Sequence, residues 1–161
     1  MLRKISNILI IIGIIFYLCI LLVNYNIYIT NNKIVNSLIY SDITVNYYVG
    51  YIEINNKKIP LAYGTDEKEL NQNIVGISKH STKKHLVLAG HAIKPVFLYL
   101  YEIDINENII IYLNQKYYNY YVDNKHIVED NDISIYDNEG LTLITCIDKT
   151  KRLIVHAKTA N

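Results

Sequence analysis

The sequence contains few residues that interrupt secondary structure, and few cysteines. It has six Gly, two Pro and two Cys among 161 residues, together with 16 Tyr. A chain so poor in breakers and so rich in β-formers lies outside the compositions of disordered and collagen-like proteins, so we expect it to fold. Cys19 and Cys146 cannot build a disulfide framework, and their positions argue against mutual pairing, so we expect two free thiols.

A strong net charge of either sign is also absent. Sixteen Lys and Arg stand against fifteen Asp and Glu, which gives a formal net charge of +1. Binding to nucleic acid needs a broad positive field, so we expect no nucleic-acid partner. The chain length is typical of one folded domain.

The most conspicuous feature present is a long apolar run near the N-terminus. From Ile8 to Val23 nearly every residue is apolar. Extended to residues 6–29, the run exceeds the roughly 20 residues that a helix needs to cross the hydrocarbon core. We therefore predict that residues 1–29 form a short cytoplasmic stub and a transmembrane anchor, with residues 6–29 in contact with the lipid bilayer.

The flanking charges predict the orientation of this anchor. Arg3 and Lys4 precede the run, whereas the first basic residue after it is Lys33. The positive-inside rule then places the N-terminus in the cytoplasm and the rest of this single-pass cell-membrane protein outside. A cleaved signal peptide is the alternative, but no small-x-small site follows the run. A buried core helix fits poorly, because the run is apolar all round.

The remaining chain divides into a linker and a domain. Residues 30–47 are rich in Asn, with apolar residues spaced as in a helical stalk. Residues 48–161 contain short β-branched and aromatic runs separated by turn signals, which predict a sheet-rich extracellular domain. The expected strands are 48–54, 59–63, 85–90, 108–113, 116–130, 141–145 and 152–158. Two short helices are expected, at 67–72 after a capping Asp66 and from Pro95 to Glu102.

Cys146 is the candidate nucleophile. It would be the one thiol outside the membrane, and it ends the expected strand 141–145. An inert buried cysteine is the usual interpretation of a lone Cys. Here, however, Lys149, Lys151 and Arg152 follow closely, and such cations favour the reactive thiolate. Arg152 lies across the predicted hairpin from Cys146, where its guanidinium could reach the thiol.

A general acid or base must come from the five histidines. His91 is favoured by position, because it follows an apolar strand and Gly90, much as Cys146 follows its own strand. His156 is the rival, since two-residue alternation places it on the same strand face as Arg152. The other three lie in polar surroundings and are expected at the solvated surface: His80, His85 and His126.

Three motifs, in this order, resemble those of the sortase family. The segment Leu88–His91 resembles the family's segment that ends in its catalytic histidine, and Thr142–Cys146 resembles the Thr-Leu-x-Thr-Cys signature. Arg152 matches the arginine of the last sortase strand. Similarity in residues 50–54 and 59–65 extends the resemblance over nearly the whole predicted domain.

The resemblance implies a fold and an activity. The fold is a closed eight-stranded β-barrel with short helices, and the activity is that of a cysteine transpeptidase on the surface of a Gram-positive bacterium. Sortases cleave a Leu-Pro-x-Thr-Gly-like sorting signal near the C-terminus of secreted proteins through a thioacyl intermediate. An amine, usually from a peptidoglycan precursor, then resolves that intermediate.

The resemblance also implies roles for individual residues. Cys146 would be the nucleophile, His91 the general acid and base, and Arg152 the group that steadies substrate carbonyls and the oxyanion. Five residues would bind substrate: Ala89, Ile144 and Thr145 along the groove, with Ile133 and Ile135 as an apolar wall for the Leu-Pro portion.

Departures from the family pattern bear on cofactors and class. The loop 78–84 lacks the carboxylates with which some class A sortases bind calcium, so we expect neither a metal nor another cofactor. The short segments before and after Cys146 favour class A or a D-like relative. The ending 152–158 also resembles class B, which is less expected, and the absence of a second membrane span argues against class C.

Other classes of cysteine enzyme fit these residues less well. Papain-like peptidases place their cysteine at a helix start, and L,D-transpeptidases follow it closely with an arginine, whereas Ile147 and Asp148 follow Cys146. The alternative that is not an enzyme is a membrane-tethered β-domain for surface adhesion or scaffolding, in which Cys146 is inert. A thiol reagent distinguishes the two, because a buried structural cysteine does not react in the native state.

Overall fold

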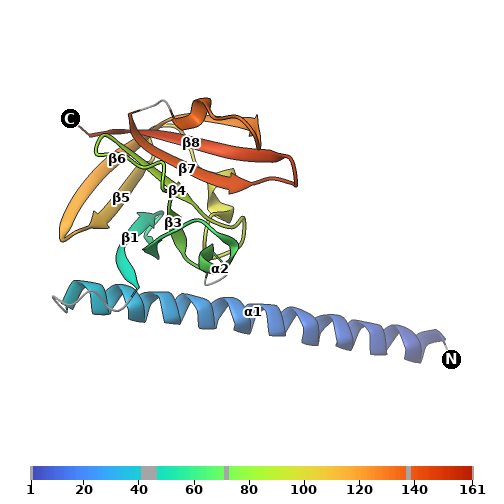
Figure 1. Cartoon of the computed structure of the whole chain (residues 1–161). Helices are drawn as coiled ribbons and strands as arrows, with labels where there is room; N and C mark the ends of the chain where they lie inside the picture. Colours follow the sequence, from blue (N-terminus) through green and yellow to red (C-terminus); the bar gives the residue numbers. More distant parts are fainter. Residues whose placement is uncertain (1, 41–46, 71–72, 137–138, 161) are drawn as a thin grey trace.

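The computed structural model describes residues 2–40, 47–70, 73–136 and 139–160, which form one long helix and a β-barrel (Figure 1). The helix α1 (Leu2–Tyr40) is followed by β1 (Tyr48–Ile54), β2 (Lys57–Tyr63), α2 (Glu67–Leu70), β3 (Val75–Ile77) and β4 (His85–Ala89). The second half contains the 3-10 helix η1 (Leu98–Tyr101), β5 (Asn108–Leu113), β6 (Lys116–Glu129), the 3-10 helix η2 (Ser134–Tyr136), β7 (Gly140–Cys146) and β8 (Lys151–Thr159).

The eight strands close into a barrel in the order β1-β2-β3-β4-β7-β8-β6-β5. Neighbouring strands run antiparallel except for the parallel pairs β2–β3 and β4–β7. Alternate residues of each strand point inward and fill the interior, as Ile52 and Ile54 of β1 and Leu141 and Leu143 of β7 do. The predicted fold class, a mostly β protein with a closed eight-stranded barrel after an N-terminal helix, is confirmed.

Helix α1 has two parts with different surroundings. Its stretch Asn7–Leu38 is long and apolar enough to cross a membrane, and the side chains from Ile8 to Leu22 are exposed. Asn31 and Val35, one helical turn apart, are buried instead where α1 packs on β1 and β2. The barrel therefore lies against the C-terminal half of the helix, while the N-terminal half extends beyond it (Figure 1).

This packing gives the expected stalk a definite form. Residues 30–40 continue the helix without a break, and residues 41–46 lie outside the described residues. Pro60 and Ala62 alternate with the core residues of β2, so they face outward, yet both are buried because α1 covers this strand. The part of the stalk before residue 41 is thus fixed to the barrel through one helical face.

Several local predictions need correction. Strand β2 begins at Lys57 rather than residue 59, because Asn55 and Asn56 both take positive φ angles (51° and 60°) and form a two-residue hairpin turn alone. The helix expected from Pro95 to Glu102 is a turn followed by the short 3-10 helix η1, after a cis Lys94–Pro95 peptide. The helix expected at 67–72 is described only to Leu70, since 71–72 lie outside the described residues.

Two further differences concern burial and pairing. Strand β3 was not expected, because three residues are too few to show an alternation; it pairs with β2 on one side and β4 on the other. His85, predicted at the surface, is 2% exposed, and its Nε2 lies 2.7 Å from the Thr142 hydroxyl oxygen. A polar sequence context did not signal this buried hydrogen bond.

Candidate active site

A surface cavity of about 270 Å³ lies at the ends of β4 and β7 and the start of β8. Its lining includes the three residues predicted to carry the chemistry, Cys146, His91 and Arg152. It also includes three of the five predicted substrate-binding residues: Ala89, Ile144 and Thr145. The fold thus brings together residues from two strand ends and a hairpin that are far apart in the sequence.

Cys146 and Arg152 face each other across the β7–β8 hairpin. They are the last cross-strand partners of this antiparallel pair. Side chains of directly opposed residues leave the sheet on the same face, with Cβ atoms roughly 4.5–5.5 Å apart. The thiol of Cys146 is free and exposed. The register therefore places the side chains of Cys146 and Arg152 on the same face of the sheet, and both line the cavity.

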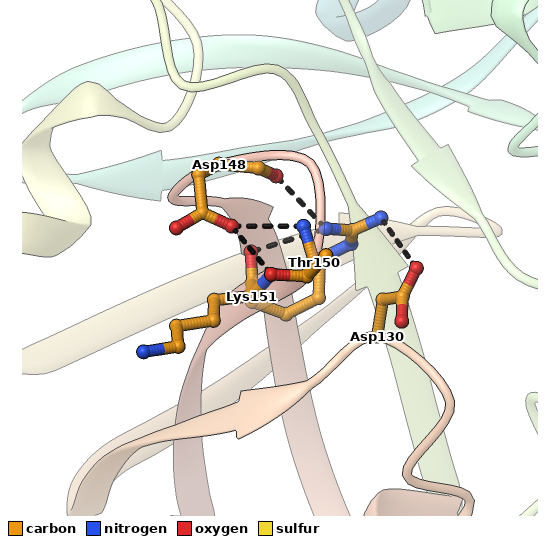
Figure 2. Close-up of polar contacts among 5 residues, drawn as sticks. Asp130, Asp148, Thr150 and Lys151 are labelled. Carbon is orange, nitrogen blue, oxygen red and sulfur yellow. Dashed lines mark hydrogen bonds and ion pairs between the residues drawn. The ribbon is translucent and has the colours of Figure 1, made fainter.

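The guanidinium of Arg152 is held by the loop that joins the two strands. Its Nη1 donates to the main-chain oxygens of Asp148 and Lys151, each at 3.1 Å, and its Nη2 lies 3.8 Å from a carboxylate oxygen of Asp130 (Figure 2). The main chain around the loop therefore holds Nη1, and Asp130 lies near Nη2, so the guanidinium is oriented before any substrate binds.

The loop is itself ordered by the carboxylate of Asp148 (Figure 2). This group accepts hydrogen bonds from the main-chain N–H groups of Thr150 and Lys151, both at 2.8 Å, and from the Thr150 hydroxyl at 3.2 Å. These bonds, that of the Thr150 amide foremost, hold the pKa of the Asp148 carboxyl below its usual range. The charged carboxylate thus fixes the same loop that positions Arg152.

His91 is positioned by the end of β4. The Gly90 N–H donates to the Ile144 carbonyl at 3.1 Å, and the Thr145 hydroxyl donates to the Gly90 carbonyl at 2.8 Å. The His91 carbonyl accepts from the amides of Ile93 and Phe97, at 2.9 and 3.1 Å, which closes the turn after it. The imidazole Nε2 is buried and has no hydrogen-bond partner in the described part of the chain. A buried polar atom without a partner is rare in folded proteins and is typical of functional sites.

His156, the rival histidine, has other partners. It faces Thr142 across the β7–β8 pair, four residues from Cys146, which is about 13 Å along a strand. Its Nδ1 lies 2.5 Å from the Asp123 carboxylate and its Nε2 lies 2.8 Å from the Glu139 carbonyl oxygen. Burial alone would raise the pKa of the Asp123 carboxyl, but hydrogen bonds from Lys158 and His156 outweigh it and lower that pKa.

Two predicted substrate-binding residues lie elsewhere. Ile133 and Ile135 are not among the residues that line the cavity. Ile135 is 6% exposed, in η2, whereas Ile133 is 77% exposed in the loop before it. Gly90 and three residues that were not predicted to belong to the site also line the cavity: Thr65, Leu70 and Ser78. These three come from segments around α2 and β3, and only the barrel closure brings them to Cys146.

A second, more polar cavity adjoins the first. It has a volume of about 400 Å³ and shares Thr65 and Ser78 with the cavity around Cys146. Asp66, Lys79 and His80 line its remainder, together with Gly64. Within the described ranges, no group of three or more His, Cys, Asp or Glu side chains is placed to hold a metal ion.

A thiol, an imidazole and a guanidinium in one surface cavity form the chemical set of an acyl-transfer enzyme with a cysteine nucleophile. A family model described as the sortase domain matches residues 51–160 of this chain. The chain therefore belongs to the sortase family, whose members are cysteine transpeptidases. The resemblance noted in the sequence is confirmed at the level of the family.

Solved sortase structures are similar to the barrel. Sortase C of Streptococcus pneumoniae is 25% identical, with a TM-score of 0.66 over 73% of this chain and 69% of that one. Sortase C1 of Streptococcus agalactiae is 29% identical, with a TM-score of 0.65 over 74% and 70% of the two chains. Sortase A of Listeria monocytogenes shares the fold at 20% identity, with a TM-score of 0.62 over 72% and 89%. No curated protein matches the chain by sequence.

Proposed function

We propose that this chain is a membrane-anchored sortase that cleaves a Leu-Pro-x-Thr-Gly-like sorting signal and transfers the cleaved protein to a cell-wall amine. The observation that supports this most directly is the single cavity lined by Cys146, His91 and Arg152. Secreted proteins that bear such a signal would be the first substrate, and a peptidoglycan precursor or another amine would be the acceptor.

In the first half of the reaction, the Cys146 thiolate, formed when His91 has taken the thiol proton, attacks the carbonyl carbon of the Thr–Gly bond. The guanidinium of Arg152, already directed by two loop carbonyls, stabilises the negative charge that develops on the carbonyl oxygen. The C–N bond then breaks, and His91 gives a proton to the departing amine. The products are a thioester on Cys146 and a free Gly amine.

In the second half, the acceptor amine attacks the thioester carbonyl. His91 takes a proton from this amine as the bond to carbon forms, and the C–S bond breaks to release the Cys146 thiolate. One histidine therefore acts as acid and then as base, which requires a ring nitrogen that is not held by a protein partner. The absence of such a partner among the described residues supports this role.

The substrate chain would lie along Ala89, Ile144 and Thr145. Thr145 is 1% exposed and its Oγ1 already donates to the Gly90 carbonyl, so it would support the groove rather than offer a free hydroxyl to the substrate. The predicted apolar wall of Ile133 and Ile135 stays a prediction; Ile133, at 77% exposure, is the member with surface to offer. A lower rate with Leu-Pro substrates in Ile133→Asp, at unchanged stability, would support it.

The anchor would hold the enzyme at the outer face of the cell membrane. Residues 6–29 would lie in the lipid, with the N-terminus in the cytoplasm and the barrel outside. A tag at each end checks this orientation. In intact cells from which the wall has been removed, external protease should remove a C-terminal tag and spare an N-terminal one.

The proposed function is tested with the full chain in lipid nanodiscs. Wild type is given fluorogenic Leu-Pro-x-Thr-Gly peptides and an amine acceptor, and the transfer product is identified by mass. Cleavage should be lost in Cys146→Ala and His91→Ala and kept in His156→Ala, the matched histidine control. If no peptide is cleaved and Cys146 is alkylated only after unfolding, the chain is instead a non-catalytic tethered domain.

A further inference from the structure

The main-chain carbonyl of Cys146 has a partner that no motif of the site includes. The Tyr101 hydroxyl donates a hydrogen bond to this oxygen at 2.7 Å, the usual length for an O–H···O bond. Tyr101 is the last residue of η1 and lies 45 residues before Cys146 in the chain. A side chain from a different element thus reaches the main chain of the proposed nucleophile.

The strand pairing explains why no neighbouring strand donates to this carbonyl. The Ile147 N–H donates to the Lys151 carbonyl at 2.9 Å, so the preceding pair, Cys146 and Arg152, is of the kind whose main-chain groups point away from the partner strand. The Cys146 carbonyl is therefore directed toward the β4 side. Strand β4 ends before it can donate to this carbonyl. The last main-chain hydrogen bond from the β4 segment to β7 goes from the Gly90 amide to the Ile144 carbonyl.

The Tyr101 hydroxyl donates the hydrogen bond that a longer β4 would otherwise supply. As a result, the peptide group between Cys146 and Ile147 is held from both sides, its oxygen by Tyr101 and its N–H by Lys151. A peptide plane held at both ends cannot rotate about the Cys146 ψ angle without breaking a hydrogen bond. This constraint acts on the residue that bears the sulfur.

The main chain around Tyr101 is held by its surroundings, whereas its side chain is 39% exposed. Its neighbours Leu100 and Ile103 are buried in the core, 0% and 2% exposed. The ammonium of Lys125, on β6, donates to the Tyr101 carbonyl at 2.8 Å and to the Ile103 carbonyl at 3.2 Å. These are carbonyls at the C-terminal end of a helical turn, which lack helical donors and favour a cation. Lys125 therefore fixes the end of η1 from which Tyr101 projects.

We propose that Tyr101 is a positioning residue for Cys146, kept in place by Lys125, and that it fixes the main chain of the nucleophile so that the sulfur is aligned with Arg152 and His91. This inference rests on the proposed function. Tyr101 exchanges no proton with substrate in this scheme. It acts only through the carbonyl of Cys146, and a misplacement of about 1 Å in such a site can cost roughly 100-fold in rate.

The test compares Tyr101→Phe with wild type, using the full chain in nanodiscs and a Leu-Pro-x-Thr-Gly peptide. The variant keeps the ring and loses only the hydroxyl. We expect kcat to fall about 10- to 100-fold with little change in KM. Tyr121→Phe is the matched control, since Tyr121 is 46% exposed on β6 and lies outside the cavity; its kinetics should equal those of wild type.

Two further measurements separate positioning from general stability. In Tyr101→Phe, alkylation of Cys146 by iodoacetamide, which needs no fixed approach, should keep its rate and its pH profile. Lys125→Met should lower kcat as Tyr101→Phe does, the double variant should be no worse than either, and Lys125→Arg should recover most of the rate. Equal kcat values for wild type and Tyr101→Phe would overturn the proposal.

Hydrogen exchange keeps this outcome distinct from a failure of the proposed function. The Ile147 amide belongs to the peptide group that Tyr101 holds, so its exchange should be about tenfold faster in Tyr101→Phe, while the Val155 amide should be unchanged. Unchanged exchange at Ile147 overturns the proposal even if wild type cleaves no peptide. An inactive wild type overturns the proposed sortase reaction. Faster exchange at Ile147 in Tyr101→Phe would still support the inference that Tyr101 fixes the main chain of Cys146.

Discussion

The hydroxyl of Thr145 donates to the carbonyl of Gly90 at 2.8 Å, and this buried hydrogen bond joins the two strand ends that carry the site. Thr145 immediately precedes Cys146 on β7, and Gly90 immediately precedes His91 after β4. The distance between the thiol and the imidazole is therefore set by residues one step away from them. Four predictions follow from this bond and from other contacts described above.

Thr145→Val removes the hydroxyl and keeps the shape of the side chain. The buried Gly90 carbonyl then loses its donor, which should lower the free energy of unfolding by about 1–3 kcal/mol. Urea unfolding checks the stability, and peptide cleavage below the unfolding transition checks the activity. The control is Thr142→Val, also on β7, which removes the hydrogen bond between Thr142 and His85. A similar loss of stability is expected there, but the fall in kcat should be confined to Thr145→Val.

Gly90→Ala should destabilise the barrel. A Cβ at this position would lie 2.8 Å from the Val96 Cγ1 and 2.9 Å from the Phe97 Cδ2, closer than real contacts. Both neighbours are fully buried, so relief requires shifts in the core that cost about 1–3 kcal/mol. Gly13→Ala, with nothing within 4 Å of the added Cβ, is the matched control and should leave barrel unfolding unchanged. Equal unfolding curves for the two variants would contradict this packing.

The order of the β7–β8 loop should depend on pH through Asp148. Hydrogen bonds lower the pKa of its carboxyl in the folded state, so its contribution is complete above the unfolded pKa of about 4 and is lost as the pH falls through the lowered value. Exchange of the Thr150 and Lys151 amides should therefore quicken below about pH 4, beyond the change in intrinsic exchange.

Two variants check the role of the Asp148 charge. Asp148→Asn keeps an acceptor and should remove the pH dependence, whereas Asp148→Ala should loosen the loop at every pH. Because Arg152 is bonded to two carbonyls of this loop, Asp148→Ala should also lower kcat for peptide cleavage. An unchanged pH profile in Asp148→Asn would show that another group orders the loop.

Val35→Glu should detach the helix from the barrel. Val35 is 1% exposed where α1 packs on β1 and β2, and a carboxylate cannot be buried there without a partner. Hydrogen exchange in β2 should then increase, with the barrel still folded. Asn36→Glu introduces the same charge at the next, exposed position and should have no such effect. Equal exchange in both variants would argue against a docked helix.

The sequence predicted those parts of the structure that have a local or a motif signal. Alternation and turn residues indicated seven of the barrel strands, and the three motifs indicated Cys146, His91 and Arg152. Alternation could not distinguish His91 from His156, because His156 lies on the same outer face of β8 as Arg152. It lies four residues further along the strand, which alternation does not show. The strand register places His156 opposite Thr142, whereas His91 lines the cavity with Cys146, which supports the prediction of His91.

The remainder depended on contacts between distant segments. Strand β3 is only three residues long, and its identity depends on β2 and β4 beside it. The burial of His85 depends on Thr142, and the role inferred for Tyr101 depends on the early end of β4. No periodicity within one segment can indicate such relationships, since each is created only when the barrel closes.

The β7–β8 hairpin has a consequence for how the site forms and fails. Cys146 and Arg152 are joined by the short loop 147–150, so the entropy lost in bringing them together is small. His91 is brought to them only by the pairing of β4 with β7. The Gly90–Thr145 hydrogen bond beside it joins residues that are 55 positions apart in the sequence. A chain in which that pairing has opened keeps Cys146 opposite Arg152 but separates both from His91. Under the proposed mechanism, such a partly unfolded molecule would not complete acyl transfer and would react only as an ordinary exposed cysteine.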